Sequence, residues 1–203
     1  MILYIHGFAG SGLGTKAKRV REYFTEAAFA PSLPYIPDLA MDTLIQIAEQ
    51  AKRLEEPLYL VGSSLGGFFA LYLAERFDLK AVLINPALRP WETLAAHTGE
   101  GTNYYDGARF EWTSGHVESL KKYRTRLSRP EKILLMLQSG DEVLDYRVAL
   151  EELQGAQTIL EEGGDHAFQG FEKHLPAISE FFGQRKSHPL KQTFGYIKKQ
   201  RQV

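Results

Sequence analysis

Short apolar runs alternate along this chain with longer segments of helical spacing, and no other feature limits the possible folds as much. Apolar residues recur at i, i+3, i+4 and i+7 from Val20 to Ala27 and from Leu44 to Ala51, as on helices that cover a sheet. The run Leu65–Phe77 is apolar nearly all round, which predicts the most buried helix. Apolar strands joined by crossover helices favour a parallel sheet with both faces covered. The predicted strands are Ile2–His6, Ser32–Ile36, Leu58–Gly62, Ala81–Asn85, Ile133–Gln138 and Gln157–Glu161.

Two segments depart from this alternation. Residues 86–116 show no clear periodicity, yet they carry both tryptophans of the chain, Trp91 and Trp112. An irregular stretch of this length inside a domain is usually a lid or a binding loop. Residues 184–203 contain six Lys or Arg residues and no Asp or Glu. We therefore expect one domain over residues 1–183, with a lid-like loop at 86–116, followed by a basic C-terminal tail at 184–203.

The composition excludes several classes of function. The 203 residues include no cysteine, which excludes thiol nucleophiles, disulfides and thiolate metal sites. A formal net charge of −1 gives no electrostatic case for a nucleic-acid binder. The N-terminal apolar stretch does not have the form of a signal peptide, and no window approaches the roughly 18 apolar residues of a membrane span. These features predict a cytoplasmic protein with no membrane span, and they leave its oligomeric state open.

The glycine-rich segment near the N-terminus has some likeness to a nucleotide-binding loop. However, Thr15 stands where the pattern G-x-G-x-x-G needs its last glycine. The order Gly14-Thr15-Lys16 likewise inverts the Gly-Lys-Thr order of a phosphate-binding loop. We therefore predict that the protein uses no nucleotide, and no other cofactor or metal is indicated.

A candidate nucleophile lies at the junction between a predicted strand and the most buried predicted helix. The stretch GSSLG at residues 62–66 satisfies the pattern G-x-S-x-G only when Ser64 is at its centre. A serine on such a sharp turn has its hydroxyl above the sheet, and side chains at the two glycine positions would collide with neighbouring backbone. The alternative is that Ser63 and Ser64 only cap the helix.

A serine nucleophile needs a base, and histidine is the usual one. His166 follows the last predicted strand on a glycine-containing loop, at the sheet edge where reacting groups gather in such folds. His97 and His116, in the irregular segment, are the alternatives. His6 ends the first predicted strand just before Gly7, and we expect it to orient a loop through hydrogen bonds.

The histidine in turn needs a carboxylate to orient it. Asp141 lies close behind a buried predicted strand, whereas Asp145 has another role available as the N-cap of the next helix. Asp165 adjoins His166 in sequence, so its side chain would tend to point away. Asp141 is therefore favoured, and the chain order becomes serine, acid, histidine.

That order is the one found in the α/β-hydrolases, and the chain resembles a small member of that superfamily. The matching segments are HGFAGS near the start, GSSLGG, GDEVLDY and GGDHAF. Through Asn85–Pro90 and Gly140–Arg147 the chain is most similar to the bacterial YqiA-type esterases. The resemblance extends from residue 1 to about residue 183. It implies a compact α/β-hydrolase fold whose sheet lacks the two strands that usually precede the HG motif, leaving about six mainly parallel strands.

The resemblance also implies a mechanism and a substrate class. The backbone N–H groups of Phe8 and Leu65 would form an oxyanion hole. We predict a cofactor-free carboxylesterase or thioesterase that forms an acyl-enzyme on a small-molecule ester or thioester, such as an acyl-CoA. Trp91 and Trp112 would contact the substrate as part of an aromatic wall around the acyl group. The alternative for this segment is a cluster that only covers the sheet.

Two other readings of the whole chain stay open at the sequence level. A non-catalytic interaction protein could use the same scaffold. Peptidases and C–C hydrolases use similar triads, because fold and triad do not determine the substrate.

Overall fold

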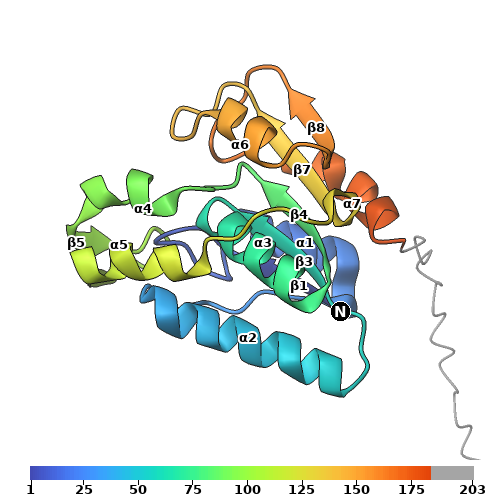
Figure 1. Cartoon of the computed structure of the whole chain (residues 1–203), viewed down its shortest axis with the longest axis horizontal. Coiled ribbons are helices and arrows are strands. Elements are labelled where there is room, and N and C mark those ends of the chain that lie inside the picture. The colour runs from blue at the N-terminus through green and yellow to red at the C-terminus, as the bar shows by residue number, and fades with distance from the viewer. Residues whose placement is uncertain (184–203) are drawn as a thin grey trace, which may run out of the picture.

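The computed structural model describes residues 1–183, so the predicted basic tail at 184–203 lies outside the described residues. Six strands form one parallel sheet in the order β2-β1-β3-β4-β7-β8. Figure 1 labels β1, β3, β4, β7 and β8 of this sheet. This arrangement confirms the predicted α/β class and the parallel pairing. The strands of this sheet are β1 (Ile2–Ile5), β2 (Ala28–Phe29), β3 (Tyr59–Ser63), β4 (Lys80–Ile84), β7 (Ile133–Gln138) and β8 (Gln157–Glu161).

Helices cover both faces of the sheet because successive strand residues enter two different hydrophobic clusters. Leu60 and Leu83 pack on the face covered by α2 (Pro37–Arg53) and α3 (Leu65–Phe77). Val61 and Val82, one position away, pack on the face covered by α1 (Thr15–Phe24) and α7 (Leu175–Phe181). As predicted, α3 is mostly buried. Among residues 1–183, no helix has both the length and the apolarity to cross a membrane. The remaining α-helices are α4 (Pro90–Thr93), α5 (Ser114–Leu120) and α6 (Tyr146–Glu152).

One predicted strand, Ser32–Ile36, is wrong. The second strand is β2, which pairs with β1 earlier in the chain at Ala28–Phe29. Pro31 and Pro34 have no N–H to donate to a ladder, so the chain leaves the sheet after Phe29. The segment from Leu33 to Tyr35 instead reaches the candidate site described below.

Residues 86–116 are more regular than their sequence indicates. They contain α4, a two-stranded antiparallel hairpin of β5 (Gly99–Thr102) and β6 (Arg109–Trp112), and the start of α5. On β6 the buried residues Phe110 and Trp112 alternate with exposed ones, but this alternation lasts only four residues. Its partner β5 is largely exposed and holds two glycines. A period-2 signal this short cannot be separated from irregular sequence.

Candidate active site

Ser64 occupies the turn between β3 and α3 with backbone angles φ 56° and ψ −121°. Non-glycine residues rarely adopt a positive φ, and such strain costs on the order of 1–3 kcal/mol. The glycines on either side are required by space. A Cβ on Gly62 would lie 2.2 Å from the carbonyl oxygen of Gly66, and one on Gly66 would lie 2.1 Å from that of Ile5. The Ser64 side chain makes no helix-cap hydrogen bond, so capping is not its role here.

His166 and Asp141 extend from Ser64 as a chain of hydrogen bonds. His166 Nε2 lies 3.0 Å from Ser64 Oγ, and His166 Nδ1 lies 2.8 Å from Asp141 Oδ2. An ionised carboxylate only accepts, so Nδ1 carries the proton in the neutral ring and Nε2 is left to accept from the serine. Three segments far apart in sequence thus place the three predicted residues together.

The Asp141 carboxylate is held on both oxygens. Its side chain is only 2% exposed, and Oδ1 accepts from the backbone N–H groups of Val143 and Leu144 at 2.9 and 2.8 Å. Burial raises the pKa of Asp141, but the hydrogen bonds from His166, Leu144 and Val143 outweigh it, so the pKa lies below its usual value. The group therefore stays ionised near neutral pH.

The alternative histidines and acids have other contacts. His116 caps α5, and its Nδ1 accepts from the Thr113 N–H at 3.2 Å. His97 packs its ring 6.3 Å from that of Phe8. Asp145 caps α6 by accepting from the Arg147 N–H at 2.9 Å, which agrees with its expected role.

Two buried amide side chains hold the loop that carries His166. Asn85 directly follows β4 and Gln138 is the last residue of β7, and their exposed fractions are 2% and 3%. Asn85 Nδ2 donates to the carbonyl oxygens of Asp165 and His166, at 3.1 and 3.3 Å. Gln138 Oε1 accepts from the N–H groups of Asp165 and Gln169, at 3.1 and 2.8 Å. Neither residue was predicted to have a role in the site, although a polar residue at the end of an apolar strand is a signal that could have indicated one.

The loop after β1 passes directly over Ser64. A Cβ on Gly7 would lie 3.2 Å from Ser64 Cβ. The N–H groups of Phe8 and Leu65 are engaged by no hydrogen bond within residues 1–183, and Leu65 is the first residue of α3, where N–H groups have no intrahelical partner. Within residues 1–183, both N–H groups are therefore available for a further hydrogen bond.

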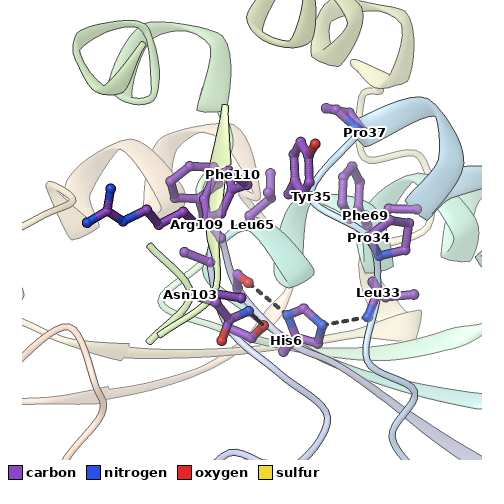
Figure 2. Close-up of a pocket in the computed structure, with 16 residues that line it drawn as sticks. His6, Leu33, Pro34, Tyr35, Pro37, Leu65, Phe69, Asn103, Arg109 and Phe110 are labelled. Carbon is purple, nitrogen blue, oxygen red and sulfur yellow. Dashed lines mark hydrogen bonds between the residues drawn. The ribbon is translucent and has the colours of Figure 1, made fainter. Parts of the chain in front are cut away.

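His6 ties this loop to the neighbouring segment through backbone bonds, as expected. Its Nδ1 lies 2.9 Å from the carbonyl oxygen of Gly7, and its Nε2 lies 2.9 Å from the N–H of Leu33 (Figure 2). The Leu33 N–H can only donate, so Nε2 accepts and the ring is neutral. Burial lowers the pKa of His6, and the hydrogen bond to Gly7 opposes this only in part.

A cavity of about 190 Å³ opens beside the same loop (Figure 2). Phe8 and Leu65 belong to its lining, so it adjoins the two free N–H groups. Tyr35, Phe69 and Phe110 supply aromatic walls from three different parts of the chain. Pockets for drug-sized ligands usually measure about 300–1,000 Å³, so this one suits a smaller group.

Neither predicted tryptophan belongs to the cavity lining. Trp112 is 1% exposed, packs its ring 4.8 Å from that of Phe8 and donates Nε1 to the carbonyl oxygen of Leu94 at 3.1 Å. Trp91 packs against Phe68, on a different side of α3 from the cavity-lining Phe69. The aromatic side chains around the cavity therefore come from other residues, because the hairpin turns Trp112 inward.

Ionisable groups near the site are used by the scaffold. Lys16 Nζ donates to the carbonyl oxygen of Ala167 at 2.7 Å. Burial lowers the pKa of Lys16, and the negative charge of Asp165 offsets this only in part. Glu142 accepts from the His166 N–H at 3.0 Å. Over residues 1–183, no three His, Asp or Glu side chains are grouped so that they could hold a metal ion.

Comparison with known proteins agrees with this architecture. Residues 1–183 match the family described as "Uncharacterised protein family (UPF0227)". A UPF0227 protein of Shewanella sp. (strain MR-4) is 30% identical over 190 residues, covering 89% of this chain and 98% of the relative. Mouse alpha/beta hydrolase domain-containing protein 10 superposes with a TM-score of 0.67 at 19% identity, covering 90% of this chain and 89% of that one. Est1E from Butyrivibrio proteoclasticus, solved with ferulic acid bound, gives 0.67 at 18% identity, covering 89% and 86%.

Proposed function

Because the chain belongs to the UPF0227 family and has the α/β-hydrolase fold, we propose that it is a serine hydrolase that cleaves carboxylic esters. One observation carries the proposal: the continuous hydrogen-bonded chain from Ser64 Oγ through the His166 ring to Asp141. A serine hydroxyl is activated when a histidine lies within hydrogen-bond reach, here at 3.0 Å. The other ring nitrogen of that histidine is held by a buried carboxylate, as it is by Asp141 here.

In the proposed mechanism His166 Nε2 takes the proton as Ser64 Oγ attacks the acyl carbonyl carbon. The carbonyl oxygen becomes an oxyanion that accepts from the N–H groups of Phe8 and Leu65. The tetrahedral intermediate collapses, and His166 gives its proton to the departing alcohol. Water then attacks the acyl-enzyme and gives a proton to His166, which passes it to Ser64 Oγ as the acid leaves. Asp141 stabilises the imidazolium at both stages.

The cavity supports an assignment of the two halves of the substrate. The leaving group must lie beside His166, which protonates it, and His166 does not line the cavity. The acyl group then takes the opposite side, against Phe69 and Phe110. A cavity of about 190 Å³ with these walls favours short acyl chains. Thioesters carry the same acyl carbonyl and are proposed as a second substrate class.

The test is hydrolysis of p-nitrophenyl esters from acetate to palmitate by the wild type and by Ser64→Ala. We expect turnover of the short esters by the wild type, and none by the variant because it lacks the attacking oxygen. Equal rates in both proteins would mean that Ser64 is not the nucleophile. If both proteins are inert on esters and on acyl thioesters, the result would favour the alternative of a non-catalytic interaction protein on the same scaffold.

A further inference from the structure

The loop after β1 has a conformation that its own sequence does not favour. Ala9, next to the proposed oxyanion donor Phe8, has a φ of 52°. Alanine rarely adopts this left-handed region, and a residue held there persists only when its surroundings fix it. His6 supplies one support, at Gly7. The carbonyl groups of Ala9 and Gly10 need another.

That support comes from the tip of the β5–β6 hairpin. The backbone N–H of Tyr104 donates to the carbonyl oxygen of Ala9 at 2.8 Å. The side-chain Nδ2 of Asn103 donates to the carbonyl oxygen of Gly10 at 3.0 Å. Both acceptors lie in the oxyanion loop, here residues 7–10, whose turn is closed by the Gly10 N–H donating to Gly7 at 3.2 Å.

Asn103 is oriented for this contact by the hairpin itself. Its backbone N–H donates to the carbonyl oxygen of Ala108 at 2.8 Å, across the tip. Its Oδ1 accepts from the Tyr105 N–H at 2.8 Å. With Oδ1 occupied by the hairpin, the amide NH₂ is left to face the oxyanion loop. One side chain therefore shapes the tip and fastens it to Gly10.

The hairpin also holds the side chain of Phe8. Phe110 and Trp112, which are the buried residues of β6, meet the Phe8 ring edge-on with centroids 5.7 and 4.8 Å away. Edge-to-face pairs at this separation are favourable beyond the area they bury. The hairpin thus contacts the ring of Phe8 and the two carbonyl groups that follow it. The Ala9 carbonyl shares its peptide group with the Gly10 N–H, which donates to the Gly7 carbonyl, and that carbonyl shares its peptide group with the Phe8 N–H.

We propose that the β5–β6 hairpin sets the geometry of the oxyanion loop and that Asn103 is the positioning residue fastening the two. The inference rests on the proposed function, and it gives residues 86–116 a role beyond lining the cavity. A donor aimed by the scaffold acts mainly on the charge of the transition state, so its loss lowers kcat more than it raises KM.

Three variants of the full chain separate this role from its alternatives. Asn103→Ala removes the whole amide. Asn103→Asp keeps an oxygen for the Tyr105 N–H but replaces the donor to Gly10 with an acceptor. Asp106→Ala is the matched control, because Asp106 accepts from the Ala108 N–H at 2.9 Å within the same tip and has no bond to the oxyanion loop.

On a short p-nitrophenyl ester we expect both Asn103 variants to lower kcat about tenfold, less than the 10²–10³ lost when a donor is removed outright. KM should stay close to wild type, and Asp106→Ala should keep wild-type kcat. Wild-type kcat in Asn103→Ala overturns the inference. So does a rise in KM with unchanged kcat, which would indicate direct substrate contact. An equal loss in Asp106→Ala would mean that only the fold of the tip matters.

Hydrogen exchange at the Gly10 amide tests the fastening without any substrate. This amide closes the turn of the oxyanion loop, so Asn103→Ala should speed its exchange and Asp106→Ala should not. Unchanged exchange in Asn103→Ala overturns the structural half of the inference. If the wild type hydrolyses no ester, the proposed function fails by itself, and the exchange rates still decide whether Asn103 fastens the loop.

Discussion

Asp141 and Asp145 are four positions apart and have different surroundings. Asp141 points into the protein, where two backbone N–H groups and His166 surround it. Asp145 points along the start of α6 and caps it. The residue type is the same, so the role is set by where the chain directs each carboxylate after β7.

This pair gives a prediction with a built-in control. Asp141→Asn should lower kcat about 10⁴-fold, because an amide can present its N–H to His166 and so favour the wrong ring tautomer. Asp145→Asn should leave kcat near wild type, since Asn caps helices as well as Asp does. Steady-state kinetics on a short ester measures both. Similar losses in the two variants would contradict the assignment of Asp141.

His6 predicts a pH dependence of stability. Its pKa in the folded protein lies below the ordinary 6.5, so the unfolded chain binds more protons between those two values. The stabilisation is therefore complete above about pH 6.5 and is lost as the pH falls toward the lowered pKa. Physically, a proton on Nε2 removes the acceptor for the Leu33 N–H.

Urea unfolding at a series of pH values measures this effect. The difference in unfolding free energy between the wild type and His6→Asn should shrink as the pH drops below 6.5. Asp141 does not interfere in this range. Its pKa is also lowered in the folded protein, but the stability that this contributes is lost only as the pH falls below the ordinary pKa of 3.8. A difference independent of pH would mean that His6 does not titrate in this range.

At the scale of an element, the start of α3 depends on glycine for space. Gly66 is the second residue of α3, and Gly115 is the second residue of α5. A Cβ on Gly66 would lie 2.1 Å from the backbone oxygen of Ile5, whereas one on Gly115 has only the Thr113 hydroxyl near it, at 3.5 Å. The same position in two helices therefore has opposite tolerance.

Gly66→Ala should prevent the native fold from forming, because a backbone oxygen of β1 cannot move aside without disturbing the sheet. Gly115→Ala should fold and gain about 0.5–1 kcal/mol, since alanine favours a helix over glycine. Soluble yield and thermal unfolding followed by circular dichroism report both. A stable Gly66→Ala protein would show that there is room for a Cβ between α3 and β1, in conflict with the 2.1 Å separation from the Ile5 oxygen.

At the scale of the whole molecule, the cavity exists only because separate segments meet. Tyr35 comes from the segment after β2, Phe69 from α3 and Phe110 from the hairpin, and Tyr35 stacks on Phe110 at 4.8 Å. Phe68, next to Phe69 in sequence, packs against Trp91 and does not line the cavity. Phe68 and Phe69 are both nearly fully buried.

Substitutions of these two neighbouring residues test the proposed acyl pocket. Phe69→Leu should enlarge the cavity and favour the longer acyl chain. The value of kcat/KM for the hexanoate ester, divided by that for the acetate ester, should rise about tenfold, which is the lower end of the effect of one methylene in an apolar pocket. Phe68→Leu should lose similar stability while the ratio stays at the wild-type value. A shift of the ratio in Phe68→Leu alone would place the acyl group on the other side of α3.

Much of the fold follows from local patterns that a single sequence contains. The apolar runs and the helical spacing predicted five of the six strands of the main sheet and the burial of α3, because periodicity reflects which face of an element is covered. The pattern GSSLG placed Ser64 at a strand-to-helix turn, because the strand before it and the helix after it both adjoin it in sequence. The strand expected at Ser32–Ile36 failed because prolines ended the pairing with β1 early.

Other features depend on contacts between segments that are distant in sequence. No spacing rule relates Asn103 to Gly10, or Gln138 to the loop of His166, because these partners meet only after the sheet edge and the hairpin have packed. The same holds for the cavity wall, where the fold turned Trp112 inward and brought Tyr35 to the rim. The sequence by itself determined five strands of the main sheet, the burial of α3 and the choice of Ser64, Asp141 and His166 as candidates, since each depends on a pattern within a few neighbouring residues. Tertiary packing alone decided which amide side chains hold the loop of His166, which residues contact the loop after β1 and which side chains line the cavity, because these partners are distant in sequence.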